Sequence, residues 1–285
     1  MKWAGDRRLS QGVATIAGVA SASSAARPPL DAGALREAVV AAGGLWRDIR
    51  VVAETGSTNS DLLTEARSGL AEGVVLAAET QSAGRGRMGR HWISPPGAAL
   101  AFSVLLRPED VPPASRGWVP LLAGVAVALA LRGQAAVEAW LKWPNDVQVN
   151  GAKLAGILAE QARDAIVVGT GINVSAARDV LPAGATSLAL EGARTDRDRL
   201  LVGVLGELEH WYLAWVGQRG DADGCGLRQE YQRLCGTLGR QVRVSLPGGA
   251  TVAGVAGEVD RAGRLVVRSA SGLVPVSAGD VVHVR

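Results

Sequence analysis

Residues 84–90 most limit what this chain can fold into, because they read Gly-Arg-Gly-Arg-Met-Gly-Arg. The three glycines match G-x-G-x-x-G, a pattern that indicates dinucleotide binding only where it joins a strand to a helix. An apolar strand is expected before the loop, at 74–79. Two prolines and a glycine at 95–97 oppose a helix after it. The sequence therefore argues against a doubly wound nucleotide-binding sheet.

The same loop has the chemistry of an anion-binding segment. Glycine allows the backbone to approach an anion closely, and the planar guanidinium of arginine matches phosphate oxygens. Taken alone, such a stretch is also typical of a solvated basic loop. Two further segments favour the anion-binding interpretation.

The first of these segments is Gly-Ser-Thr-Asn at 56–59, between an expected strand at 49–53 and an expected helix at 61–68. Each of the three polar residues is a good helix N-cap. One cap residue would be enough, so three adjacent polar side chains after a glycine indicate a binding role.

The second segment begins with Lys-Trp-Pro-Asn-Asp at 142–146, where Asn145-Asp146 is expected to form a hairpin turn. Asn150-Gly151 is a strong signal for another hairpin, leading into a strand that starts at Lys153. A lysine at the start of an otherwise apolar strand is either a solvated edge residue or a functional one.

Together these segments resemble the biotin protein ligases. The match covers about residues 45 to 285, and eleven positions lead from Lys142 to Lys153, as in that family. No single motif is specific, but the set is. It comprises Gly-Ser-Thr-Asn (56–59), Gln81 with the 84–90 loop, Trp92, Lys-Trp-Pro-Asn-Asp (142–146), Lys-Leu-Ala-Gly-Ile-Leu (153–158) and Gly-Ile-Asn (171–173).

The resemblance implies an α+β fold, with a central mixed β-sheet and flanking helices like those of class II synthetases. From Gly239 onward, short expected strands alternate with glycine turns, which predicts a small barrel. The family has an SH3-like barrel at this place. We therefore expect a disordered leader at 1–30, a catalytic domain at 31–236 and an SH3-like domain at 237–285.

The resemblance also implies a two-step reaction that needs no protein nucleophile. The biotin carboxylate attacks the α-phosphate of ATP, and a lysine of a carrier protein then takes the biotinyl group. Lys153 and Arg87 are the expected catalytic residues. The expected biotin-binding residues are Ser57, Thr58, Asn59, Gln81, Arg85, Gly86, Arg87, Lys153 and Gly156. The expected ATP-binding residues are Arg85, Arg87, Arg90, Trp92, Lys142 and Asn173.

Two of these roles have a structural alternative. Trp92 either stacks on adenine or packs in the core. Asp146 either holds Mg²⁺ or closes its turn through its side chain.

Composition bounds the remaining function classes. The chain has 285 residues, 30 basic and 27 acidic, and a net charge of +3 is too small to indicate nucleic-acid binding. Two cysteines and three scattered histidines indicate neither a disulfide framework nor a zinc site. We find no eighteen-residue apolar run and no secretory leader. We therefore expect a cytoplasmic protein without membrane or nucleic-acid partners. A transit peptide at 1–30 is a weaker alternative.

The expected partner is the biotin carboxyl carrier domain of an acetyl- or acyl-CoA carboxylase. The oligomeric state is left open, with a weak homodimer as one option. The short segment before the catalytic domain leaves no room for a winged helix, so a monofunctional ligase is expected. The alternatives are a lipoate ligase or octanoyl transferase, a biotin-sensing transcriptional regulator, and a module that only binds biotin.

Overall fold

The structure is a computed structural model that describes residues 27–40 and 43–284. Residues 1–26 of the expected leader lie outside this part of the chain. The leader's last residues contact the folded protein. The backbone N–H of Leu30 donates to the Glu79 carboxylate at 2.6 Å, and Arg197 donates to the carbonyl of Pro28 at 2.6 Å.

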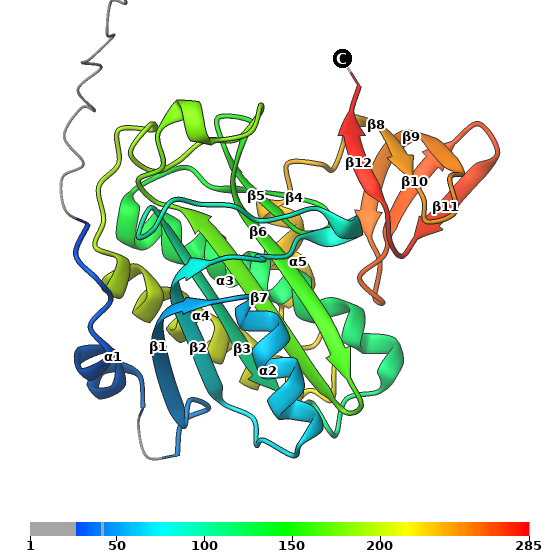
Figure 1. The fold of residues 1–285 in the computed structure, drawn as a ribbon. Helices are drawn as coiled ribbons and strands as arrows, with labels where there is room; N and C mark the ends of the chain where they lie inside the picture. Colours follow the sequence, from blue (N-terminus) through cyan, green and yellow to red (C-terminus); the bar gives the residue numbers. More distant parts are fainter. Residues whose placement is uncertain (1–26, 41–42, 285) are drawn as a thin grey trace, which may run out of the picture.

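The larger domain is built on a seven-stranded mixed sheet in the order β1-β2-β3-β7-β6-β5-β4 (Figure 1). Strands β1 and β2 pair in parallel, and every other neighbouring pair is antiparallel. This arrangement confirms the expected mixed sheet. The strands are β1 Asp48–Thr55, β2 Val74–Gln81, β3 Ala99–Leu106, β4 Trp140–Lys142, β5 Asp146–Val149, β6 Ala152–Ala162 and β7 Ala165–Asn173.

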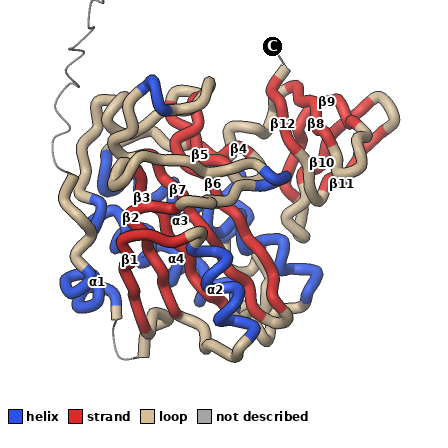
Figure 2. Tube along the Cα trace, viewed as in Figure 1, coloured by secondary structure: helices blue, strands red, loops and turns tan. Residues whose placement is uncertain are grey.

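Helices cover both faces of this sheet, as the tube view shows (Figure 2). Helices α3 and α4 pack together on one face, and α2 lies on the other, against β3, β6 and β7. The helices are α1 Ala32–Val39, α2 Thr58–Arg67, α3 Val119–Ala135, α4 Arg197–Gly217 and α5 Leu227–Leu234, with short 3₁₀ turns at Arg87–Gly89, Pro113–Trp118 and Arg178–Val180.

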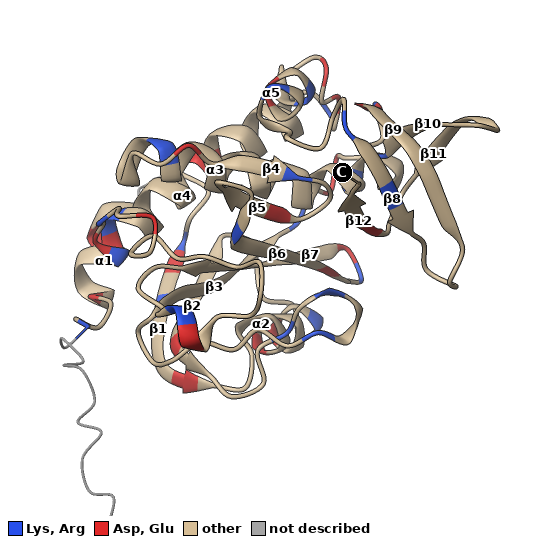
Figure 3. Cartoon of the chain, turned by 90° about the horizontal axis from the view of Figure 1, so that it is seen from above, with Lys and Arg blue, Asp and Glu red and all other residues tan. Residues whose placement is uncertain are grey.

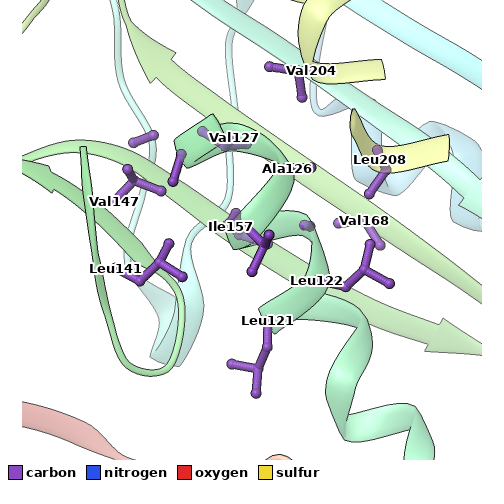
Figure 4. Close-up of a cluster of buried hydrophobic side chains, with 14 of the residues drawn as sticks. Leu121, Leu122, Ala126, Val127, Leu141, Val147, Ile157, Val168, Val204 and Leu208 are labelled. Carbon is purple, nitrogen blue, oxygen red and sulfur yellow. The ribbon is translucent and has the colours of Figure 1, made fainter. Parts of the chain in front are cut away.

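The larger core lies between the sheet and the α3–α4 layer. Leu121, Leu122 and Val127 of α3 meet Ile157 and Val168 of the sheet there (Figure 4). Strand β3 is buried throughout because its apolar side chains alternate between this core and the smaller one beneath α2. By length and composition the helical stretch Pro113–Ala135 could cross a membrane, but 67% of its most apolar window is buried inside the protein, as in a core helix.

The smaller domain is a five-stranded antiparallel sheet in the order β11-β10-β9-β8-β12, as expected for the carboxy-terminal domain. Two buried tryptophans of the larger domain hold it in place. The indole of Trp118 donates to the carbonyl of Arg261 at 2.8 Å, and that of Trp143 donates to Gly263 at 3.3 Å. The strands are β8 Gln241–Ser245, β9 Thr251–Val259, β10 Leu265–Ser269, β11 Gly272–Val276 and β12 Asp280–His283.

Two local expectations need correction. Helix α2 begins at Thr58 rather than Asp61, because Ser57 takes the N-cap position and the polar residues after it form the first turn. The turn between β4 and β5 consists of residues 143–145, and Asp146 is already the first residue of β5. The Asn150-Gly151 hairpin is confirmed: both residues have positive φ, at 51° and 78°, as a tight turn of this kind requires.

Candidate functional site

A cavity of about 830 Å³ opens on the larger domain beside the carboxy-terminal sheet. The segments that line it come from α2, the loop after β2, the β4–β5 turn, β6 and β7. The structure brings every site residue expected from the sequence to this cavity: Ser57, Thr58, Asn59, Gln81, Arg85, Gly86, Arg87, Arg90, Trp92, Lys142, Asp146, Lys153, Gly156 and Asn173.

One end of the cavity is a buried polar network at the start of α2. Gln81 Oε1 accepts from the backbone N–H of Thr58 at 2.9 Å and lies 3.1 Å from Thr58 Oγ1. Thr58 Oγ1 also lies 2.7 Å from Ser103 Oγ, which donates to Asn59 Oδ1 at 2.6 Å. Ser57 sits at the N-cap, yet its hydroxyl makes no capping hydrogen bond and lines the cavity. These side chains do more than cap a helix.

The glycine–arginine loop is a compact hairpin-like turn. The N–H of Trp92 donates to the carbonyl of Gly84 at 2.9 Å, and the N–H of Gly86 donates to that of Arg90 at 2.7 Å. Met88 and Gly89 at its tip have φ of 54° and 72°, so the chain reverses through left-handed conformations. The turn carries its arginines along the rim of the cavity.

Each arginine of the loop has a partner on another element. Arg85 forms a salt bridge with Glu160 of β6 at 2.8 Å. Arg87 donates to Asn145 Oδ1 at 2.8 Å, and Arg90 pairs with Asp280 of β12. The loop is thereby tied to the sheet and to the carboxy-terminal domain.

Arg87 is the most buried of the three arginines in this loop. Burial lowers the pKa of its guanidinium, and the nearby carboxylates of Asp280 and Asp146 oppose that shift. An arginine keeps its charge at neutral pH even so. The cavity therefore contains a permanent, partly desolvated cation.

Lys153 reaches into the cavity from the start of β6. Its Nζ lies 2.6 Å from Asp146 Oδ1, and the two side chains are about one third and one fifth exposed. A methyl group added at Gly156 would lie 3.1 Å from the same Nζ, so this glycine leaves room for the lysine. Asp146 supplies the negative charge that balances this lysine.

Trp92 is partly buried and packs on the sheet at the cavity wall. Its ring packs against Gly171 and Gly156, which are paired across β6 and β7. It also lines the cavity, and its buried indole N–H has no hydrogen-bond partner. Asn173, further along β7, donates to the carbonyl of Thr186. Lys142 lines the cavity from the end of β4.

Sequence reasoning missed two walls of the cavity and part of the polar network behind it. One wall is Asp280, Val281 and Val282 of β12, and the other is residues 179–185. Behind the lining, Ser103 and Glu160 both hydrogen-bond to Asn59. Ser103 could have been found from the sequence, because it is a polar residue in the otherwise apolar segment that forms β3. The other residues carry no motif.

The arrangement suits the joining of two anions. Basic residues surround one part of the cavity, while uncharged donors and acceptors occupy another. Figure 3 shows basic and acidic residues interspersed over the chain, so the net charge of +3 gives no hint of this local concentration. Within the described ranges no three His, Cys, Asp or Glu residues cluster as a metal site.

Comparison with known proteins agrees with this geometry. The profile of the Biotin/lipoate A/B protein ligase family matches residues 52–175, and that of the biotin protein ligase C-terminal domain matches residues 237–284. A biotin–[acetyl-CoA-carboxylase] ligase from Mycobacterium tuberculosis is 46% identical over 264 residues, which cover 91% of this chain and 97% of that protein.

More distant relatives agree. The bifunctional ligase/repressor BirA of Escherichia coli is 33% identical over 84% of this chain and 74% of its own length. A biotin protein ligase from Aquifex aeolicus, solved with biotin and ATP, superposes with a TM-score of 0.71 at 26% identity, covering 84% of this chain and all of that one. This chain therefore belongs to the biotin protein ligase family and is an ATP-dependent ligase.

Proposed function

We propose that the cavity joins biotin to AMP and then passes the biotinyl group to a lysine of a carrier protein, as a biotin–[acetyl-CoA-carboxylase] ligase. The observation that carries this proposal is the position of Lys153 and Arg87. Both cations line one cavity with the uncharged polar network of α2. A carboxylate and a triphosphate repel each other in water, so bringing them together requires such cations.

In the first step the biotin carboxylate attacks the α-phosphorus of ATP, and pyrophosphate leaves. The uncharged network of Ser57, Thr58, Asn59 and Gln81 holds the ureido ring, which needs both donors and acceptors. Lys153 turns from Asp146 toward the reacting oxygens and stabilises their negative charge. Arg85, Gly86 and Arg87 hold phosphate and carboxylate oxygens.

The remaining expected contacts concern the nucleotide. Trp92 offers the face of its ring to adenine at the cavity wall. Arg90 assists with the polyphosphate, and Lys142 and Asn173 border the same cavity. In the second step the ε-amine of the carrier lysine attacks the biotinyl carbonyl, and AMP leaves.

Asp146 is our candidate for the residue that shares a Mg²⁺ ion with the phosphates. Magnesium in such sites uses one or two carboxylates together with phosphate oxygens, so a three-residue protein cluster is not required. Asp146 lines the cavity, and an anionic substrate that attracts Lys153 would release its oxygen. The ion would neutralise phosphate charge there.

The biological setting follows from this activity. We propose a cytoplasmic enzyme acting on the biotin carboxyl carrier domain of an acyl-CoA carboxylase, without nucleic-acid or membrane partners; the oligomeric state stays open, with a weak homodimer as one option. We assign residues 31–236 to catalysis and 237–285 to a domain whose β12 closes one wall of the cavity.

Pyrophosphate release with Mg-ATP tests this proposal. Release is expected with biotin and not with lipoate. Equal release with lipoate would refute selectivity for biotin, and release with lipoate alone would refute biotin as the substrate. No release with either acid would refute adenylate formation.

A further inference from the structure

Glu160 lies outside the main cavity but contacts two residues that line it. It sits on β6 and borders a smaller cavity of about 370 Å³ on the far side of the glycine–arginine loop. One carboxylate oxygen, Oε1, lies 2.8 Å from an Arg85 nitrogen. The other, Oε2, accepts from Asn59 Nδ2 at 2.9 Å. A single carboxylate therefore joins the glycine–arginine loop to the uncharged end of the cavity.

The contacts of Asn59 determine which way its amide faces. Its Nδ2 lies within hydrogen-bond distance of Glu160 Oε2 and of the carbonyl oxygen of Leu158, at 3.1 Å. Both of those oxygens can only accept, so the nitrogen must face them. Asn59 Oδ1 is then left to face Ser103, and an amide oxygen cannot donate. Ser103 must therefore give its only hydrogen to Asn59.

The same reasoning fixes the direction of the next hydrogen bond, between Ser103 and Thr58 at the cavity wall. The 2.7 Å contact between Ser103 Oγ and Thr58 Oγ1 needs a hydrogen, and only Thr58 has one left to give. Thr58 therefore donates to Ser103 rather than to Gln81 Oε1 at 3.1 Å. It faces the cavity with lone pairs, as an acceptor. The side-chain oxygen of Gln81 accepts from the backbone N–H of Thr58, so the NH₂ group of Gln81 stays available as a donor.

We propose that Glu160 is a positioning residue that sets the direction of this hydrogen-bond chain and holds Arg85 beside it. The inference rests on the proposed function. A ureido group has N–H donors and a carbonyl acceptor. It is matched by an accepting Thr58 and a donating Gln81, and it would be mismatched if the chain ran the other way.

The key variant is Glu160→Gln. A carboxylate gives Arg85 and Asn59 one oxygen each, whereas a glutamine has only one oxygen for the two donors. One contact must then face an NH₂ group. Either the NH₂ group repels Arg85, or the Asn59 amide rotates by half a turn and the direction of the hydrogen-bond chain through Ser103 and Thr58 reverses. We expect the Kd for biotin to rise about 10-fold at pH 8 by calorimetry.

The control is Glu65→Gln. Glu65 forms a comparable ion pair, 2.7 Å from Arg50, and lines neither of the two cavities. Its biotin Kd is expected to stay within about 2-fold of wild type, as for a surface ion pair. Thermal melting of each variant confirms folding.

A swap of the two side chains separates positioning from mere support of the strand. Asn59→Asp alone sets two carboxylates against each other and weakens biotin binding. In Asn59→Asp with Glu160→Gln, the glutamine NH₂ donates to the new carboxylate at position 59 while its oxygen keeps Arg85, and Ser103 still donates to position 59. The carbonyl of Leu158 loses its donor in the single and the double variant alike, so this loss cancels in the comparison. We expect the double variant to bind biotin at least about 10-fold more tightly than Asn59→Asp.

The outcomes are distinct. A Glu160→Gln variant that binds biotin like wild type, or a double variant no better than Asn59→Asp, would overturn the role of Glu160. Biotin binding and adenylate formation by the wild-type enzyme are measured in the same series. Their absence would instead overturn the proposed function.

Discussion

Gly171→Ala tests the position of Trp92 with the smallest possible change. Gly171 lies on β7 beneath the tryptophan ring. A methyl group built there would be 2.4 Å from Cε2, 2.6 Å from Cζ2 and 2.9 Å from Cδ2 of Trp92. Carbon atoms in contact lie about 3.5–4.0 Å apart, so the ring must move by about 1 Å.

A displaced ring can no longer stack on adenine as proposed. Stacking of a base on an aromatic side chain is worth about 1–3 kcal/mol, which corresponds to a rise of about 5- to 150-fold in the KM for ATP. The biotin Kd measured without ATP should change little, because the α2 network does not contact this glycine. Overpacking should also lower the free energy of unfolding by about 1–3 kcal/mol.

The assay is biotin-dependent pyrophosphate release at varied ATP, with tryptophan fluorescence reporting on the ring. Gly206→Ala is the matched control. Gly206 lies in α4, and a methyl group there meets nothing within 4 Å. That variant should keep the wild-type KM values and gain about 0.5–1 kcal/mol in stability. A normal ATP KM in a folded Gly171→Ala protein would refute the stacking role of Trp92.

Three further predictions follow from the site and its border. Lys153→Ala should fold normally and form adenylate about 10- to 150-fold more slowly, and near-normal pyrophosphate release would contradict this. Arg87→Gly should release free biotinyl-adenylate, measured as faster labelling of a bystander such as albumin; labelling no faster than by wild type, with adenylate still formed, would exclude a retaining role. Burial, with the charges of Lys142 and Arg240, lowers the pKa of His283 below its ordinary 6.5, so the unfolded chain binds the proton more readily. The free energy of unfolding should therefore fall as the pH drops below about 6.5, and His283→Gln should flatten that part of the curve in urea titrations; an unchanged curve would contradict it.

The sequence was sufficient to predict most local elements and the motifs that meet at the cavity. Asn150-Gly151 specifies its hairpin through backbone conformation alone, and the turn places Lys153 at the start of β6. Residues of this kind can be found because nearby chain chemistry determines them.

Other features depend on contacts between distant segments, so they could not be predicted from the sequence. Asp146 neutralises Lys153, and Asp280 meets Arg90 across the two domains. Neither acid stands in a pattern that indicates its partner. Glu160 likewise looks like an ordinary polar residue of a strand until α2 and the loop are folded against it. Tertiary packing alone determines these pairs.

The central claim is transfer of biotin to a carrier protein, and mass spectrometry of the carrier tests it most directly. The full chain is incubated with biotin, Mg-ATP and a biotin carboxyl carrier domain, and the carrier is then digested and mapped. We predict a gain of one biotinyl group on a single lysine, dependent on ATP. An unmodified carrier, with active ligase confirmed by pyrophosphate release, would contradict the account.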